Sequence, residues 1–292
     1  MIKKTMGDWT LDFIVYIMLA LFAASTLLPF ANVFSKSVSA EWAVISGKVG
    51  LLPVDFQLDT MKFVVTSNSF LKSLGVSIYI TVIGTLLCML LTAVTAYPLS
   101  KRHLPGIGFV LLLFVFTMLF SGGMIPNYLL IRELGLINSL WSLILPALIG
   151  VFNLLVIKSF YESLPESLEE SAKLEGAGNL LILFRIILPL SGPVLATISL
   201  FYAVYFWNDF FGPMLYINNP SLKPLQLYLR DIVMEADSVQ MGLNKTVDEM
   251  MNITPEGIRS ATVIASTVPI LLVYPYLQKY FIKGVLIGSV KG

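Results

Sequence analysis

The chain has 292 residues, of which 57% are hydrophobic and 13% charged, and its net charge is +1. Soluble domains carry about a quarter charged residues, so the composition and a mean hydropathy of +0.83 indicate a membrane protein. The single cysteine, Cys88, and single histidine, His103, exclude an intrachain disulfide and a His/Cys metal site. The small net charge gives no indication of a nucleic-acid partner.

Six apolar stretches are long enough to cross a bilayer, whose ~30 Å hydrocarbon core requires about 20 helical residues. They are too long for strands and lack the alternation of a transmembrane barrel. The first is also too long for the apolar region of a signal peptide, so we interpret it as a retained span. We predict an all-α integral membrane fold with about six transmembrane helices in one domain. The predicted spans are 11–34, 74–97, 107–130, 140–160, 187–211 and 261–282.

Glycine and proline interrupt several of these spans. Two interpretations are open: simple helix termination, or an irregular backbone that lines a pathway, where neighbouring groups or water satisfy the freed carbonyls. The interruptions are Gly122, Gly123 and Pro126 in the third span, Pro146 in the fourth, and Pro269 and Pro275 in the sixth.

Basic residues gather in the 98–106 loop and at the two chain ends, which share one side of the membrane if there are six spans. Short basic loops mark the cytoplasmic side. We therefore expect a multi-pass plasma-membrane protein with both termini in the cytoplasm, extracellular loops at 35–73 and 212–260, and a cytoplasmic loop at 161–186. The basic residues are Lys3, Lys4, Lys101, Arg102, His103, Lys279, Lys283 and Lys291.

The 161–186 loop is the most informative segment. Ser163 followed by Glu166 has the spacing of a capping box, which predicts the start of a helix. Glu169 and Lys173 have the i,i+4 spacing of a stabilising ion pair on that helix.

The same helix has one apolar face and a defined end. Leu164, Leu168 and Ala172 recur every four residues and form an apolar stripe, and Gly176 and Gly178 end the helix. Such an amphipathic helix either docks into a groove on a soluble partner or lies on lipid headgroups. The small residues Ala172 and Gly176 would let a partner approach the backbone closely.

The seven fixed positions of the family pattern E-A-A-x3-G-x9-I-x-L-P are present at full spacing in this region; six are identical, and serine replaces the first alanine. The pattern resembles the EAA loop of binding-protein-dependent ABC permeases, the membrane subunits of type I importers. The matching residues are Glu170, Ser171, Ala172, Gly176, Ile186, Leu188 and Pro189.

Other features are similar to the carbohydrate-uptake branch of that family, which includes the smaller maltose-transport subunit. They are the order of six spans, the long outer loop before the last span, the run from Trp207 to Phe210 and the chain ending 278–292. The chain looks most like oligosaccharide permeases of Gram-positive bacteria.

The resemblance implies that the 161–186 loop holds a coupling helix that sits in a cleft of an ATP-hydrolysing subunit. It implies a complex with a second permease of different sequence, two ATPases, an extracellular substrate-binding protein and an oligosaccharide. Since the chain lacks a G-x4-G-K-[ST] phosphate loop, we expect no enzymatic activity or cofactor in it, with ATP and Mg on the partner ATPases. The expected coupling residues are Glu169, Glu170, Ser171, Ala172, Gly176, Ile186, Leu188 and Pro189.

A cluster near the outer end of the fifth span is the candidate substrate path. Aromatic faces stack on sugar rings and amide or carboxylate groups bind hydroxyls, although an aromatic belt at the membrane interface is equally compatible with the pattern. The cluster comprises Tyr202, Tyr205, Phe206, Trp207, Asn208 and Asp209, and a second group comprises Asn127 and Tyr128.

Three further segments have interpretations that the resemblance suggests. Residues 216–229 correspond to the part of the outer loop that contacts the binding protein in the family. The acidic stretch 235–249 is either a further docking surface or a solvated insert. The tail, 283–292, either reaches the ATPase or is a solvated basic end near anionic lipid.

Other functional classes remain as alternatives. A permease of the same superfamily for a non-sugar solute would share the coupling loop. A secondary transporter would need ionisable groups deep within the spans, and the sequence places very few there. A membrane enzyme would need a catalytic set at one membrane face, which the sequence does not offer. The pattern does not distinguish acidic from neutral sugars.

Overall fold

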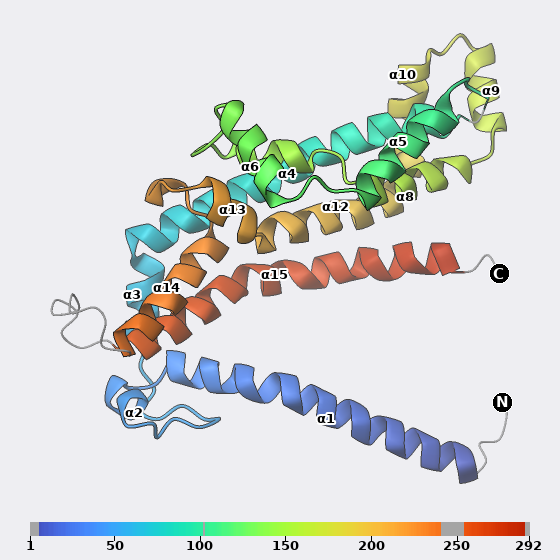
Figure 1. The fold of residues 1–292 in the computed structure, drawn as a ribbon. Helices are drawn as coiled ribbons and strands as arrows, with labels where there is room; N and C mark the ends of the chain where they lie inside the picture. The colour runs from blue at the N-terminus through green and yellow to red at the C-terminus, as the bar shows by residue number, and fades with distance from the viewer. Residues whose placement is uncertain (1–5, 102, 241–253, 290–292) are drawn as a thin grey trace. The chain divides into compact units, whose positions relative to one another are not determined.

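The computed structural model describes residues 6–101, 103–240 and 254–289, and its regular structure there is helical (Figure 1). The bridged pair Ser39 and Phe56 is the one strand-like contact in these ranges. The helices of the first half are α1 (Met6–Ser37), α2 (Glu41–Ile45), α3 (Asp59–Thr66), α4 (Asn68–Leu99), α5 (Ile107–Leu119), α6 (Met124–Glu133), α7 (Trp141–Ile144) and the 3-10 turn η1 (Leu145–Ala147). Those of the second half are α8 (Val151–Glu162), α9 (Ser167–Leu174), α10 (Asn179–Ile182), the π-helical turn η2 (Leu183–Ile187), α11 (Leu188–Leu190), α12 (Gly192–Asn208), α13 (Phe211–Tyr216), the 3-10 turn η3 (Pro220–Leu222), α14 (Leu225–Gln240) and α15 (Pro255–Ser289).

The chain packs as two compact units, which we describe separately. The terminal unit comprises residues 1–70 and 229–269, and the central unit comprises residues 71–228 and 270–292. All the coupling and substrate-path residues expected from the sequence belong to the central unit.

The predicted all-α fold with about six spans is confirmed. Within the described ranges, three helices are long and apolar enough to cross a membrane, and three bent helix pairs raise the number to six if each pair is one span. The long helices are Gly7–Ser37, Asn68–Leu99 and Pro255–Val273. The bent pairs are Ile107–Leu119 with Met124–Glu133, Trp141–Ala147 with Val151–Glu162, and Asn179–Leu190 with Gly192–Asn208, at 111°, 45° and 84°.

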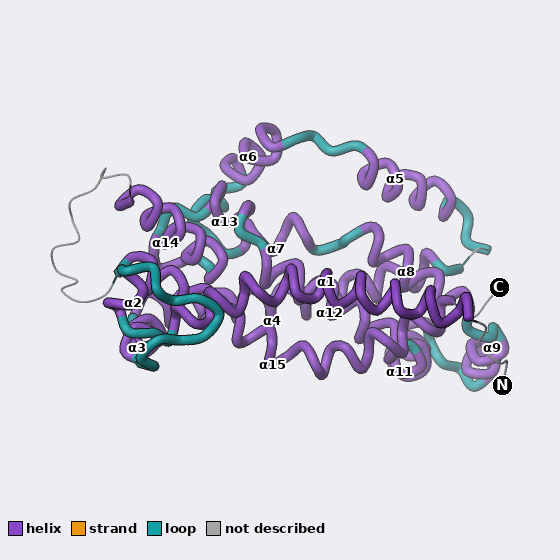
Figure 2. Tube along the Cα trace, turned by 90° about the horizontal axis from the view of Figure 1, so that it is seen from below, coloured by secondary structure: helices purple, strands orange, loops and turns teal. Residues whose placement is uncertain are grey.

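The interruption that the sequence indicates near Gly122 and Gly123, within the predicted span 107–130, is present in the structure. Helix α5 ends at Leu119, and the loop to α6 is clear in Figure 2. Gly123 precedes α6 with φ +87°, a backbone conformation that residues other than glycine rarely adopt. The chain therefore bends by 111° at the break that contains the glycines, where one helix ends and another begins.

The prolines of the later spans differ in their effect on the helix that contains them. Pro146 lies in the turn η1, at the 45° bend of the fourth candidate span. Helix α12 has Pro193 in its first turn, where a proline needs no N–H partner, and this break at the start of the fifth span was not predicted. By contrast, α15 continues as one helix through Pro269 and Pro275.

The core of the central unit joins α4, α8 and α12 around one tyrosine. Tyr202 is buried, its hydroxyl lies 2.8 Å from Thr92 Oγ1, and it accepts a 2.9 Å hydrogen bond from the backbone N–H of Gly150. Gly150 lies in the break between α7 and α8, so this bond satisfies a donor that the bent span leaves free. Cys88 is buried in the same core, as predicted for a small apolar residue.

Large apolar side chains cover much of the outer surface. No residue of α5 is buried, and Phe109, Leu112 and Phe116 are all more than half exposed. Contiguous apolar surface of this kind is typical of a protein whose solvent is lipid.

Candidate functional site

The expected coupling helix is present as α9, with a start that differs from the prediction. Ser163 does not cap it, because its Oγ donates to the carbonyl of Phe160, 2.7 Å away, at the end of α8. Helix α9 begins at Ser167, and its N-cap residue Glu166 makes no side-chain cap bond. The capping-box prediction is therefore wrong, since the preceding helix uses the serine to complete its own last turn.

The predicted end of α9 is confirmed. The backbone N–H of Ala177 donates to Ala172 at 2.9 Å, and that of Gly176 donates to Lys173 at 3.0 Å. These two bonds form a Schellman motif, which requires a left-handed residue just after the helix. Gly176 meets this requirement with φ +86°, so the chain turns sharply toward α10 (Figure 1).

Glu169 pairs with Lys101 rather than with Lys173. Both side chains of the ion pair are less than one-fifth exposed. The Tyr97 hydroxyl donates to Glu169 at 3.4 Å, and Lys101 Nζ lies 4.6 Å from the centre of the Tyr97 ring. This network ties α9 to the end of α4, and the predicted i,i+4 pair is replaced because Lys101 offers a more buried partner.

Helix α9 has one buried residue, Ala172, and an exposed surface that is directed away from the core. Ala172 is buried in the core of the central unit, so it packs against its own chain and is not the open small-residue face expected from the sequence. Glu170 and Ser171 are exposed, and Leu174 is 91% exposed. A leucine this exposed beside charged residues is suited to insertion into a groove on another protein.

The remaining residues of the family pattern lie on the helix that leads away from α9. Ile186 and Leu188 are partly buried and pack against the core, while Pro189 is exposed in α11. The π-helical turn Leu183–Ile187 precedes them. Ile186 and Leu188 therefore attach this segment to the core, whereas Pro189 lies at the surface.

A cavity of about 340 Å³ lies among α6, α7, α12 and α13. Its lining brings together two of the regions predicted from the sequence. The polar and aromatic lining residues are Ser121, Asn127, Ser142, Tyr205, Asp209 and Tyr216. Ser121, Ser142 and Tyr216 were not predicted as substrate-path residues. Ser121 and Ser142 are distant from the fifth-span cluster in the sequence, and Tyr216 was instead assigned to the 216–229 segment.

Asp209 has a structural role at the edge of this cavity. Its Oδ1 accepts 3.1 Å hydrogen bonds from the backbone N–H groups of Phe211 and Gly212 and so caps the start of α13. A Cβ atom on Gly212 would lie 2.6 Å from Asp209 Oδ2, so glycine permits the carboxylate to approach. No lysine or arginine lines the cavity among the described residues.

The other predicted substrate-path residues lie elsewhere. Tyr202 and Phe206 are buried in the core, Trp207 is partly buried and Asn208 is exposed, and none of the four lines the cavity. Tyr128 stacks on the cavity residue Tyr216, with ring centres 6.3 Å apart at 15°. The side chains of 235–249 and 283–292 lie outside the described residues.

The two candidate sites lie at opposite ends of the central unit. In Figure 1, α9 and α10 are at one end and α6 and α13 are toward the other, and Figure 2 also shows α9 far from α6 and α13. The helices between them therefore connect an exposed amphipathic helix to a cavity lined with aromatic and polar groups.

Comparison with known proteins agrees with this arrangement. The family described as "Binding-protein-dependent transport system inner membrane component" matches residues 102–287. Protein LplC of Bacillus subtilis (strain 168) is 48% identical over 271 residues, which are 92% of this chain and 90% of that protein. The polygalacturonan/rhamnogalacturonan transport system permease protein YtcP of the same organism is 45% identical over 284 residues, 96% of this chain and 98% of that protein.

A solved structure has the same fold. It is a crystal structure of a bacterial ABC transporter involved in the import of the acidic polysaccharide alginate. The matched chain has a TM-score of 0.89 and 32% sequence identity, and the match covers 96% of this chain and 100% of that one.

Proposed function

Because this chain belongs to the family of binding-protein-dependent transport system inner membrane components, we propose that it forms one half of the membrane pathway of an ABC importer for oligosaccharides. The proposal that the solute is a sugar rests on the cavity lined by Asn127, Tyr205 and Tyr216. Aromatic faces and amide groups around one cavity suit the apolar faces and hydroxyls of sugar rings. The polygalacturonan, rhamnogalacturonan and alginate in the descriptions of the similar proteins support the same class of solute.

The proposed orientation places α9 in the cytoplasm and the cavity toward the outside. Lys101 and His103, in the short basic loop, lie at the same end of the central unit as α9, since Lys101 binds Glu169. The positive-inside rule assigns that end to the cytoplasm. Both termini are then cytoplasmic, and the protein is a multi-pass component of the plasma membrane.

Coupling to ATP hydrolysis would pass through the exposed face of α9. Leu174, Glu170 and Ser171 form a surface that an ATP-hydrolysing subunit could bind in a groove. Because Glu169 is fixed to Lys101, displacement of α9 would be transmitted to α4. Closure of two ATPases would thus move two permeases between inward-open and outward-open states as packed bodies.

The other proposed partners are those that the family resemblance implies. A binding protein would deliver the sugar at the cavity end, where residues 216–229 are candidate contacts. The second permease would be a different chain, and ATP and Mg would be held by the two ATPases.

The proposal is tested by uptake of a labelled oligosaccharide into proteoliposomes that hold the full transporter and its binding protein. Tyr205→Ala should lower the uptake rate roughly two- to tenfold, because an aromatic contact contributes about 0.5–1.5 kcal/mol beyond its buried area. Phe201→Ala is the matched control, since Phe201 is an exposed aromatic residue one turn earlier on α12 that does not line the cavity. Equal uptake by the two variants would count against a sugar contact at this cavity.

A further inference from the structure

The segment that follows α1 in the terminal unit folds around a small core of its own. Ala43, Val44 and Val49 are buried together, and Val54 packs against them. The backbone N–H of Ala40 donates to Val54 at 3.1 Å, which closes the segment into a compact loop. The outward side chains of this loop are therefore held in defined positions.

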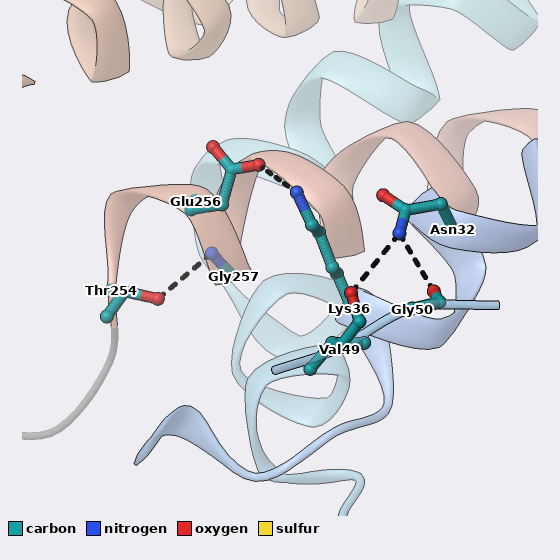
Figure 3. Close-up of polar contacts among 7 residues, drawn as sticks. All are labelled: Asn32, Lys36, Val49, Gly50, Thr254, Glu256 and Gly257. Atoms are coloured by element: carbon teal, nitrogen blue, oxygen red, sulfur yellow. Dashed lines mark hydrogen bonds and ion pairs between the residues drawn. The ribbon is translucent and has the colours of Figure 1, made fainter. Parts of the chain in front are cut away.

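Hydrogen bonds hold this loop against the last turns of α1. Asn32 Nδ2 donates to the carbonyls of Val49 and Gly50, at 3.3 and 2.8 Å (Figure 3). Ser35 Oγ donates to the carbonyl of Leu51 at 2.7 Å. Three consecutive loop carbonyls thus lie at the level of residues 32–35 of the helix.

The same end of α1 is attached to the start of α15. Lys36 Nζ forms a 2.9 Å ion pair with Glu256 (Figure 3). Glu41 accepts 2.6 and 2.9 Å hydrogen bonds from the hydroxyl and backbone N–H of Thr254. The loop is consequently supported by α1 and by the start of α15.

The length of α1 places this loop at the surface of a bilayer. With 32 residues, α1 is about 48 Å long, whereas the hydrocarbon core is about 30 Å and the bilayer with its headgroups about 40–45 Å. When a helix of this length is centred in the bilayer, its ends lie at the outer edges of the headgroup regions, and residues 32–35, just before its end, lie among the headgroups. Since Leu51 is fixed beside the last turns of α1, it lies at the same depth.

The exposed residues of the loop suit that environment. Leu51 is 51% and Leu52 78% exposed, although both belong to an ordered loop where a water-facing surface would be polar. Lys48 Nζ lies 5.4 Å from the centre of the Trp42 ring, and Trp42 Nε1 donates to Asp55 at 3.1 Å. Tryptophan and lysine beside exposed leucines are typical of the membrane interface.

We propose that residues 48–52 form a lipid-binding loop, in which Leu51 and Leu52 enter the boundary between headgroups and acyl chains and Lys48 contacts lipid phosphate. The loop would fix the depth of α1 and, through Lys36 and Glu41, of the start of α15. The proposal requires α1 to span the membrane but does not depend on the solute transported, so uptake measurements and the lipid test can fail separately.

The test uses the complete transporter in nanodiscs of phosphatidylethanolamine and phosphatidylglycerol. Leu52→Cys, made in a Cys88→Ser background with no other cysteines in the complex, is labelled with the environment-sensitive fluorophore nitrobenzoxadiazole. Gln57→Cys is the matched control, because Gln57 is exposed on the same loop but its backbone N–H donates to Val38, beyond the end of α1. Quenching by acyl-chain doxyl lipids is compared with quenching by aqueous iodide.

We expect doxyl lipids to quench the label at position 52 several-fold more than that at position 57, and iodide to do the reverse. Equal access of iodide to both positions, without quenching by doxyl lipids, would overturn the proposal. Shielding of position 52 that appears only when the binding protein is added would overturn it too, and would assign the loop to a protein partner.

Discussion

Lys101 and Glu169 show how a pair of residues can connect the coupling helix to a long span. They are 68 positions apart in the sequence and form a largely buried ion pair beside Tyr97. Hydrogen bonds to charged groups contribute about 1.5–3 kcal/mol, and loss of one partner leaves the other charge unsatisfied. The pair therefore helps to fix α9 on α4.

A charge-reversal series tests this connection. Lys101→Glu and Glu169→Lys should each lower ATP-driven uptake at least about tenfold, the factor that ~1.4 kcal/mol represents, because like charges would face each other. The double reversal should recover most of the uptake. Glu166→Lys, at the exposed start of α9, is the control and should retain uptake, and a double variant no better than the single ones would exclude the ion pair as the cause.

Tyr202 was predicted to contact the substrate, but in the structure its hydroxyl links α4 to the start of α8 within the core. Tyr202→Phe would leave the N–H of Gly150 and the hydroxyl of Thr92 without this partner. The expected loss of stability is about 1–3 kcal/mol, measured as a lower midpoint of thermal unfolding in detergent. Tyr205→Phe should leave that midpoint unchanged, since no hydrogen bond of the Tyr205 hydroxyl is found within the described chain. Equal midpoints for Tyr202→Phe and the unmodified protein would contradict this role.

At the scale of elements, α9 depends on the turn that ends it. Two hydrogen bonds of the Schellman motif and the left-handed Gly176 set the angle at which the chain leaves the helix. An L-residue in that conformation costs about 1–2 kcal/mol. The direction of the helix after α9, and hence the fit of α9 to a partner, depends on that glycine.

Gly176→Ala is therefore expected to reduce ATP-coupled uptake while the protein still inserts in the membrane. A Cβ atom at Gly176 meets nothing within 4 Å, so the effect would arise from backbone strain and not from a clash. Gly178→Ala is a close control, because Gly178 has an ordinary φ of −75° and equal space. Uptake that falls equally in both variants would indicate a general intolerance of the turn to side chains.

At the scale of the whole molecule, the proposed membrane topology can be measured directly. In a Cys88→Ser background, a membrane-impermeant maleimide should label Ser221→Cys in intact cells and His103→Cys only in inverted vesicles. Both positions are exposed, so access to reagent depends on the side of the membrane. Labelling of both from the same side would contradict six spans with the basic loop in the cytoplasm.

Family membership was predictable from the sequence, and the match over residues 102–287 confirms it. The long apolar stretches also predicted the helical membrane fold, since hydropathy over about 20 residues reflects the thickness of the bilayer. The roles of individual coupling and substrate-path residues remain predictions. The structure places Tyr205, Asp209 and Asn127 around one cavity but buries Tyr202 and Phe206 in the core.

The sequence by itself determined the features that are local along the chain: the number of apolar stretches, the basic loop, and the motif from Glu170 to Pro189. Only the tertiary structure decided the partner of Glu169, the true start of α9, the grouping of Tyr216 with Asn127, and the support of the 48–52 loop by Asn32. The physical reason is that each of these depends on which distant segments pack together, and buried polar groups take whichever partner that packing brings within hydrogen-bond distance.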